Sequence, residues 1–276
     1  MRIGLFLITN LAVMFVLSIV LSLFGLGGTG NHLGLIIFAS IFGFGGAFIS
    51  LMMSKSMAIR SVGARIIETP QNEIEKWLVS QVSEQAKSSG IETPQFAIFE
   101  SQAPNAFATG ASRDKSLVAV STGLLHTMDR DEIEAVLAHE VSHVANGDMV
   151  TLTLLQGVMN TFVMVFAHLL AALIDKGRGR GMGYFIGYFI AQSILGFLAS
   201  LVLMWFSRFR EYRADSGGAT LAGKDKMIKA LKKLESLGSS EALPKEVEAF
   251  AISGGMNELL STHPPLSKRI EALQKE

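Results

Sequence analysis

The sequence predicts an α-helical multi-pass membrane protein that carries a smaller α+β domain outside the bilayer. Two observations on composition support this fold class: hydrophobic residues make up 49% of the 276 residues, and charged residues only 17%, which is unusual for a soluble protein. A third observation is that long apolar runs occur as two pairs. The segment between the pairs has the mixed composition of a small soluble domain.

The first pair of apolar runs, Ile3 to Leu26 and Leu33 to Met53, predicts a transmembrane hairpin and makes residues 1–53 the first domain. As a helix, each run is long enough to cross about 30 Å of hydrocarbon at about 1.5 Å per residue. The Gly-rich link Gly27 to Asn31 joins them. A cleaved signal peptide is the alternative for the first run, but its apolar core is longer than such signals have and lacks a clear small-x-small cleavage site.

The second pair, Met149 to Ile174 and Met182 to Phe206, lies within residues 149–207 and is less uniformly apolar. Polar side chains interrupt these runs at Gln156, Asn160, His168 and Gln192. Basic residues crowd the link between them, at Lys176, Arg178 and Arg180. The hairpin therefore either crosses the bilayer against its charge bias or inserts only partly. Both alternatives return the chain to the same side, so residues 54–148 and 208–276 should share a compartment.

Basic residues indicate which side that is. Arg2 precedes the first run, further basic residues follow the second and fourth runs, and the link Gly27 to Asn31 carries none. Because Lys and Arg are enriched on the cytoplasmic side of membrane proteins, these ends are expected to face the cytoplasm. The prediction is a multi-pass protein of the lipid bilayer whose soluble parts lie in the cytoplasm.

Residues 54–148 should form a compact α+β segment. Thr69-Pro70 is expected to open an amphipathic helix that stops at Gly90. Two short strands follow, Gln95 to Phe99 and Leu117 to Val120, separated by a loop that runs through Pro104 to Phe107.

A mostly buried helix is expected at the end of this segment. Asp129 with Glu132 three residues later is a capping-box pattern, and the helix should end near Asn146-Gly147. The tail, residues 208–276, should hold a Lys-rich amphipathic helix near Lys224 to Leu237 and a last short helix after His263-Pro264-Pro265.

Charge and cysteine content exclude some functions. Twenty-four basic and twenty-four acidic side chains cancel, so no global field attracts nucleic acid, and no nucleic-acid partner is expected. The absence of cysteine excludes disulfides, thiolate zinc sites and cysteine nucleophiles. Any metal ligands must therefore be His, Asp or Glu.

Two of the six histidines flank a glutamate at helical spacing. His139 and His143 are four residues apart on the predicted buried helix, so their imidazoles project from one face and can bind one Zn²⁺. Glu140 can accept a proton from water at an open coordination position and deliver it to a leaving amine. An accidental match is the alternative, but burying three polar side chains without partners in an apolar helix is costly. The motif predicts a catalytic zinc site.

A catalytic zinc site needs a third protein ligand, for which Glu211 is the candidate. Glu211 lies just beyond the fourth apolar run and His143 just before the third, so both approach the same membrane face. Asp215, one helical turn after Glu211, can accept the second ring N–H of a ligand histidine. The alternative for Glu211 is an ordinary juxtamembrane charge that pairs with Arg208 or Arg213.

With these residues the chain resembles the HtpX-type membrane proteases, a branch of the gluzincins that also includes prenyl-protein endopeptidases of the Ste24 type. The likeness covers most of the chain and rests on four motifs in the family's order. They are PNAFATG at Pro104 to Gly110, LAHEVSHVANGD at Leu137 to Asp148, REYRAD at Arg210 to Asp215, and THPPLSKRI at Thr262 to Ile270.

The resemblance implies a zincin-like α+β catalytic domain that faces the cytoplasm of a bacterial inner membrane. It implies one Zn²⁺ per chain, bound by His139, His143 and Glu211. Glu140 would be the general base, and Asp215 would hold a ligand histidine from outside the coordination sphere.

The same resemblance implies residues that bind substrate. Asn105 and Phe107 would belong to an edge segment that holds the substrate backbone as an added strand, with Asn105 close to the scissile bond. In related zincins a histidine away from the metal donates to the developing oxyanion, and His263 is the matching candidate. From the residues alone, a histidine before Pro-Pro could instead shape a turn.

The resulting hypothesis is a zinc metalloendopeptidase that cleaves misfolded or damaged membrane proteins at the cytoplasmic face, as part of a stress response. The resemblance, not the composition, supplies that substrate class. One alternative keeps the chemistry but takes prenylated C-termini as substrates, although such enzymes usually have more spans. Another alternative is a non-catalytic membrane scaffold or chaperone that uses zinc only for structure. The oligomeric state stays open.

Overall fold

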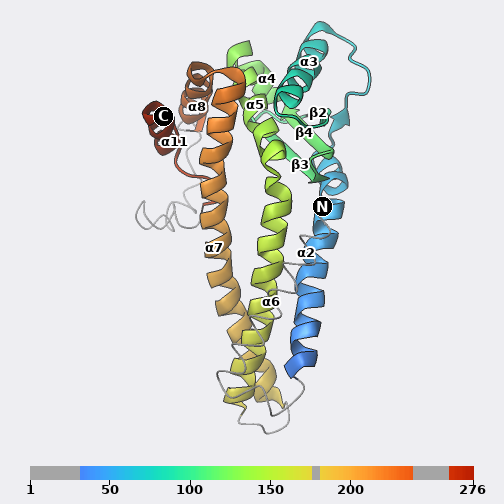
Figure 1. The fold of residues 1–276 in the computed structure, drawn as a ribbon, viewed down its shortest axis with the longest axis vertical. Coiled ribbons are helices and arrows are strands. Elements are labelled where there is room, and N and C mark those ends of the chain that lie inside the picture. The colour runs from blue at the N-terminus through green and yellow to red at the C-terminus, as the bar shows by residue number, and fades with distance from the viewer. Residues whose placement is uncertain (1–31, 176–180, 239–260) are drawn as a thin grey trace. The chain divides into compact units, whose positions relative to one another are not determined.

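A computed structural model describes residues 32–175, 181–238 and 261–276 of the chain (Figure 1). The predicted run Ile3 to Leu26 and the link Gly27 to Asn31 lie outside these residues. The contacts divide the chain into two compact units. The helical unit is made of Met1–Ser50 and Thr151–Leu203, and the α+β unit is made of Leu51–Val150 and Met204–Glu276.

Three long helices supply the described part of the helical unit: α2 (His32–Val62), α6 (Asp148–Ile174) and α7 (Met182–Ala222). Each is long and apolar enough to cross a membrane, judged by length and composition. Large apolar side chains on them are exposed, for example Phe189 and Leu173. Lipid would cover such side chains, so the helices have the character of membrane spans rather than of buried core helices.

Close packing and polar contacts hold the helical unit together. A Cβ added to Gly43 would lie 2.5 Å from the Thr161 hydroxyl oxygen, so only glycine permits this approach of α2 to α6. Thr161 donates a hydrogen bond to the carbonyl oxygen of Gly157 (2.8 Å). Tyr184 on α7 and His168 on α6 are hydrogen-bonded at 2.5 Å. His168 therefore links two helices of this unit.

The α+β unit contains a four-stranded sheet in the order β1-β2-β4-β3. Its strands are β1 (Arg65–Ile66), β2 (Gln95–Phe99), β3 (Ala106–Ser112) and β4 (Lys115–Ser121). β2 and β4 run parallel, whereas β1 and β3 are antiparallel to their neighbours. Among the described strands β3 pairs only with β4, so one edge of β3 is left open.

The predicted strands within β2 and β4 are confirmed, but the loop predicted through Pro104 to Phe107 is wrong from Ala106 onward. The segment of β3 is rich in Ala, Gly and Thr and has little β-propensity of its own. A hairpin pairs Ser112 with Lys115 and continues to Ala106 opposite Val120, so tertiary pairing forms this strand.

The two faces of the sheet bury different side chains. Val118 and Val120 of β4 belong to the main core beneath the helices. Leu117 and Ala119 alternate with them and pack with Phe99 in a second, smaller cluster. The sheet is therefore covered on both sides in the α+β unit, which explains why β4 is almost entirely apolar.

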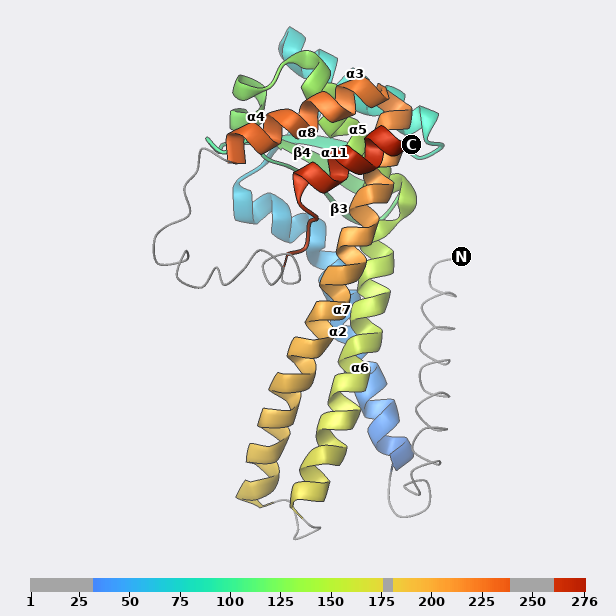
Figure 2. The same cartoon turned by 90° about the vertical axis from the view of Figure 1, so that its left-hand side faces the viewer.

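The described part of this unit also contains the helices α3 (Glu73–Ser88), α4 (Thr122–Thr127), α5 (Arg130–Asn146), α8 (Lys224–Gly238) and α11 (Leu266–Lys275). The predicted α8 and α11 are confirmed, and they lie side by side (Figure 2). α3 begins later than Thr69-Pro70, because the side chain of Asn72 caps it by accepting a hydrogen bond from the Glu75 amide.

Helix α5 is the centre of the α+β unit. The predicted capping box of Asp129 and Glu132 is present, and Gly147 ends the helix with φ of 72°, a left-handed conformation that suits glycine. A Cβ at Gly217 of α7 would lie 2.6 Å from the Ser142 hydroxyl oxygen, and one at Gly218 would lie 3.2 Å from the amide nitrogen of His139. These glycines let α7 pack directly against the histidine-bearing turn of α5.

Candidate metal centre

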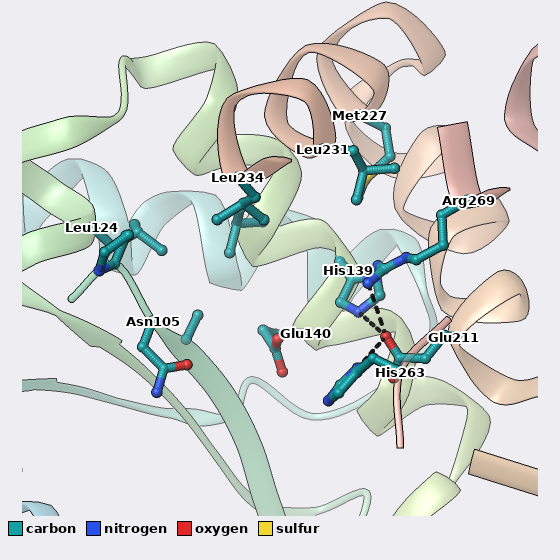
Figure 3. A pocket seen from close by; sticks show the side chains of 13 residues that line it. Asn105, Leu124, His139, Glu140, Glu211, Met227, Leu231, Leu234, His263 and Arg269 are labelled. Carbon is teal, nitrogen blue, oxygen red and sulfur yellow. Dashed lines mark hydrogen bonds and ion pairs between the residues drawn. The ribbon is translucent and has the colours of Figure 1, made fainter. Parts of the chain in front are cut away.

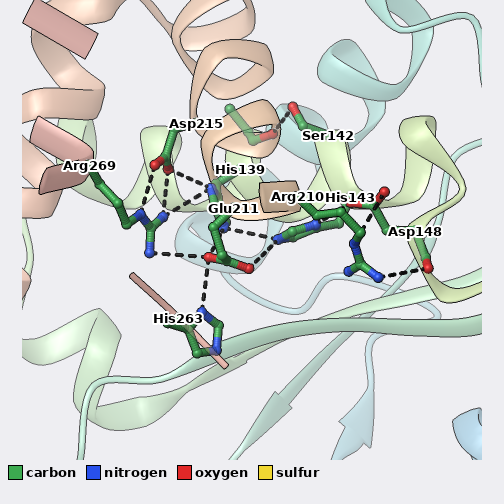
Figure 4. Close-up of polar contacts among 10 residues, drawn as sticks. His139, Ser142, His143, Asp148, Arg210, Glu211, Asp215, His263 and Arg269 are labelled. Carbon is green, nitrogen blue, oxygen red and sulfur yellow. Dashed lines mark hydrogen bonds and ion pairs between the residues drawn. The ribbon is translucent and has the colours of Figure 1, made fainter. Parts of the chain in front are cut away.

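Two helices bring the predicted metal ligands together (Figure 4). His139 and His143 project from successive turns of α5, and Glu211 comes from α7. One ligand atom from each of the three residues lies within 4.8 Å of the other two. Glu211 is only 3% exposed, so a carboxylate distant in sequence is buried directly beside the two imidazoles.

The distances among these ligand atoms are short. His139 Nε2 lies 3.1 Å from His143 Nε2. The two carboxylate oxygens of Glu211 divide between the rings, with Oε2 at 3.5 Å from His139 Nε2 and Oε1 at 3.3 Å from His143 Nε2. Three groups that can each offer a lone pair therefore converge on one point.

The other nitrogen of each ring is held by a carboxylate. His139 Nδ1 lies 3.0 Å from Asp215 Oδ1, and His143 Nδ1 lies 2.6 Å from Asp148 Oδ2. Because an ionised carboxylate only accepts hydrogen bonds, each Nδ1 donates to its carboxylate, and a ring that gives up its other proton offers its Nε2 lone pair to a metal ion. A divalent cation fits this donor set, since two imidazoles and one carboxylate would repel one another without a positive charge between them.

The pKa of His143 shows how strongly the site attracts positive charge. Burial alone would lower this pKa, but hydrogen bonds to Asp148 and Glu211 outweigh burial and raise it to about 10. The pKa of His139 is also raised, because contacts with Asp215 and Glu211 outweigh its burial. A metal ion that binds here would therefore have to displace a proton.

Two arginines, whose roles were not foreseen from the sequence, neutralise the carboxylates. Arg269 of α11, 6% exposed, forms two bonds to Asp215 (Nη2–Oδ1 2.5 Å, Nε–Oδ2 2.7 Å), and its Nη1 lies 3.2 Å from Glu211 Oε2. Arg210 donates to the carbonyl oxygen of Asp148 (2.9 Å), and its Nε lies 3.5 Å from Asp148 Oδ1. Asp215 thus holds both a ligand histidine and Arg269.

A signal for Arg269 was present in the sequence. It lies three residues after Leu266 and four before Leu273, which places a charged residue on the apolar face of a short helix. Asp148 follows the αL glycine at the end of α5, five residues after His143, and no spacing rule marks it as a partner of that ring.

Glu140 lines a pocket beside the metal ligands (Figure 3). Its side chain is 9% exposed, and Asn105, Glu211 and His263 also contribute to the wall. The rest of the wall is largely apolar and includes Leu124, Val136, Met227, Leu231 and Leu234. A carboxylate in an apolar pocket next to a cation site is suited to proton transfer on a substrate that enters there.

Asn105 and Phe107 lie at the start of β3, but their side chains go to different places. The amide of Asn105 donates to Ser121 Oγ (2.9 Å) and its carbonyl oxygen accepts from the Ser121 amide (2.8 Å), which fixes its backbone while its side chain lines the pocket. The ring of Phe107 packs against Phe99, with centroids 5.6 Å apart, in the cluster on the other face of the sheet. Its side chain is not part of the pocket wall.

His263 lies just before α11 and reaches the same site. Its side chain is 64% exposed, and its Nδ1 lies 3.0 Å from Glu211 Oε2. In this structure His263 therefore contacts the carboxylate ligand itself. Its position at the pocket rim leaves its ring accessible to a bound substrate.

Known proteins are similar to this chain over most of its length. The model of peptidase family M48 matches residues 72–276. Protease HtpX of Aeromonas hydrophila subsp. hydrophila is 56% identical over 288 residues, covering 99% of each chain. Protease HtpX of Vibrio vulnificus is 54% identical over 285 residues, again covering 99% of each.

A crystal structure of S. mikatae Ste24p has a similar fold, with a TM-score of 0.66 and 17% sequence identity. The similarity covers 95% of this chain and 62% of that one. This chain thus spans less than two thirds of the length of that protein, and the likeness is one of fold.

Proposed function

The chain belongs to peptidase family M48 and is a membrane metalloprotease, and from this premise we propose that it is a zinc-dependent endopeptidase of a bacterial inner membrane. Its proposed substrates are misfolded or damaged membrane proteins, cleaved at the cytoplasmic face. The observation that carries the proposal is the convergence of His139 Nε2, His143 Nε2 and Glu211 beside the pocket that Glu140 lines.

Zinc is the proposed metal because two neutral imidazoles and one carboxylate are the ligands that catalytic zinc sites commonly use. When bound, the ion would supply Lewis acidity toward the substrate carbonyl and lower the pKa of water toward 7. The protein supports such a site: Asp215 and Asp148 contact the Nδ1 atoms of the two rings, so both Nε2 atoms lie on the side of Glu211.

Glu140 is the proposed general base and then the general acid. It takes a proton from the water that attacks the peptide carbonyl and gives that proton to the amide nitrogen as the C–N bond breaks. The products are a carboxylic acid and a free amine, so the atoms balance. His263, at the pocket rim, is the proposed donor to the oxyanion.

The open edge of β3 supports the proposed way of binding substrate. A peptide in extended conformation can add to such an edge through backbone hydrogen bonds, which would bring its scissile bond past Asn105 toward Glu140. Only an unfolded segment can pair in this way. Extended loops and juxtamembrane segments of damaged membrane proteins fit this requirement, whereas folded soluble proteins should be poor substrates.

The test is Glu140→Gln with a matched change on the same helix, Glu134→Gln. We expect Glu140→Gln to reduce cleavage of a loosely folded membrane protein by roughly 10² to 10⁴-fold, the usual contribution of a general acid–base residue, while metal content stays near one per chain. Glu134 lies outside the pocket and bonds to Lys226, so Glu134→Gln should cleave like wild type.

Three results would count against the proposal. If the Glu140 variant cleaves as fast as wild type, this mechanism fails. If wild-type protein holds one metal ion but cleaves no membrane protein, the scaffold alternative gains support. Cleavage restricted to prenylated peptides would instead favour the prenyl-protein alternative.

A further inference from the structure

A second polar pocket lies in the α+β unit, apart from the metal site. We name it the headgroup pocket. Three segments line it: the end of α2, the chain just before and at the start of β2, and the β3–β4 hairpin. The side chains that matter for its chemistry are Lys55, Ser56, Thr93, Asp114 and Lys115, with Met52 at one side. None of them belongs to the proteolytic site described above.

The two lysines of this pocket have no carboxylate partner among the residues that the structure describes. Lys55 is half-buried, and its Nζ donates one long hydrogen bond to the carbonyl oxygen of Ser116 (3.4 Å). In the described part of the chain no carboxylate oxygen lies within 4.0 Å of Lys55 or Lys115. Other lysines in the described part of the chain do form ion pairs with carboxylates, namely Lys76, Lys226, Lys229 and Lys275. A half-buried ammonium with one weak contact is suited to binding an anion.

The pocket begins where the apolar stretch of helix α2 ends. Helix α2 is continuous, and Lys55 comes two residues after Met53, the last residue of the apolar run. From Ser54 to Ile67 the chain has three basic residues and no acidic one. Along a membrane-spanning helix this is the level of the lipid headgroups, where Lys and Arg meet phosphate. The large exposed side chain of Met52 lies on the apolar side of the same pocket.

We propose that the headgroup pocket binds the phosphodiester group of a membrane phospholipid. Lys55 and Lys115 contact the phosphate oxygens, and the hydroxyls of Ser56 and Thr93 can donate to them. Asp114, on the turn of the hairpin, accepts from a donor of the headgroup, such as a glycerol hydroxyl. Its negative charge disfavours a phosphate dianion, so a singly charged diester fits better than free phosphate.

Native mass spectrometry of the detergent-solubilised full chain, titrated with phosphatidylglycerol, tests this site. Because Lys55→Gln removes a charge-assisted contact, we expect it to weaken the tightest-bound lipid by about tenfold. Asp114→Asn should strengthen binding instead, since it removes a repulsive charge. Lys87→Gln and Glu92→Gln change the same charges at exposed positions of this unit outside the pocket and should leave binding unchanged.

Two outcomes would overturn the proposal. Equal loss in Lys55→Gln and Lys87→Gln would mean that lipid follows overall charge and not this pocket. Displacement of the lipid by an equal concentration of inorganic phosphate would mean that the site takes free phosphate. Neither outcome would count against the proposed protease activity, because none of these residues contacts the metal site. Conversely, loss of cleavage in Glu140→Gln says nothing about this pocket.

Discussion

The two histidine ligands of the metal centre are supported by the same kinds of group but in different ways. Each side consists of an imidazole, a carboxylate and a guanidinium: His139, Asp215 and Arg269 on the His139 side, and His143, Asp148 and Arg210 on the His143 side. On the His139 side the arginine grips its carboxylate with two hydrogen bonds and also reaches Glu211. On the His143 side, Arg210 makes one hydrogen bond to the backbone carbonyl of Asp148 and a looser contact, at 3.5 Å, with the carboxylate of Asp148.

The difference shows how the site is assembled. The carboxylate of the His143 side follows its histidine by five residues, so the turn from α5 into α6 sets much of that side locally. The His139 side joins three segments, with Arg269 reaching Asp215 from 54 residues away and His139 from 130. On the His143 side only Arg210 comes from a distant segment, 62 residues from Asp148, so the tightly bonded His139 side depends on more long-range contacts.

Replacing the two arginines should change the free energy of unfolding, and by different amounts. Arg269→Met would leave the buried carboxylates of Asp215 and Glu211 without a guanidinium and should cost on the order of 3–5 kcal/mol of unfolding free energy in metal-free protein. Arg210→Met should cost only about 1.5–3 kcal/mol, because one hydrogen bond from a charged donor and one looser contact are lost. Chemical unfolding of both variants in detergent measures this. Equal losses would remove the distinction between the two sides.

The next effect is on metal affinity. Asp215→Asn and Asp148→Asn each replace the carboxylate behind a ligand ring by an isosteric amide. Loss of such a partner typically weakens metal binding by about 10–100-fold. We expect the upper end for Asp215→Asn, which also releases Arg269, and the lower end for Asp148→Asn. Competition with a zinc-binding dye compares them, and a stronger loss in Asp148→Asn would reverse the proposed order.

A further effect concerns the pH dependence of zinc affinity on the His143 side. In metal-free protein the pKa of His143 is raised to about 10, so the stability from its protonated contacts is complete below about 6.5 and is lost as the pH rises through about 10. Metal must displace this proton, so apparent zinc affinity should rise by about tenfold per pH unit between pH 7 and 9.

Asp148→Asn removes the negative charge that helps to raise the pKa of His143, so the pH dependence should flatten in that variant. Calorimetry in buffers of different ionisation enthalpy counts the protons released when zinc binds. An affinity that does not change with pH would show that His143 is not protonated in the metal-free site.

Much of the site was predictable because its strongest signals are local or tied to membrane topology. The spacing of His139 and His143 follows from the helical period, and the apolar runs indicated that Glu211 returns to the same face as His143. Both rest on repeating geometry that one sequence displays. The geometry of the structure brings these three residues and Glu140 into one place.

What the sequence concealed depends on contacts between distant segments. β3 was missed because pairing with β4, not the propensity of Ala106 to Ser112, makes it a strand. Successive side chains of a strand point to opposite faces, and the ring of Phe107 lies on the face of the sheet away from the pocket. Arg269 was overlooked because a charge within a short amphipathic helix usually lies in solvent, whereas here α11 turns it inward against Asp215.

His139, His143 and Glu211 are proposed to share one zinc ion. X-ray absorption spectroscopy at the zinc edge, on the full chain loaded with one equivalent of zinc, tests it most directly. We predict about two imidazoles and further oxygen ligands per zinc at about 2.0–2.1 Å, with one imidazole fewer in His143→Ala. A spectrum without imidazole scattering, or one that His143→Ala leaves unchanged, would contradict the account.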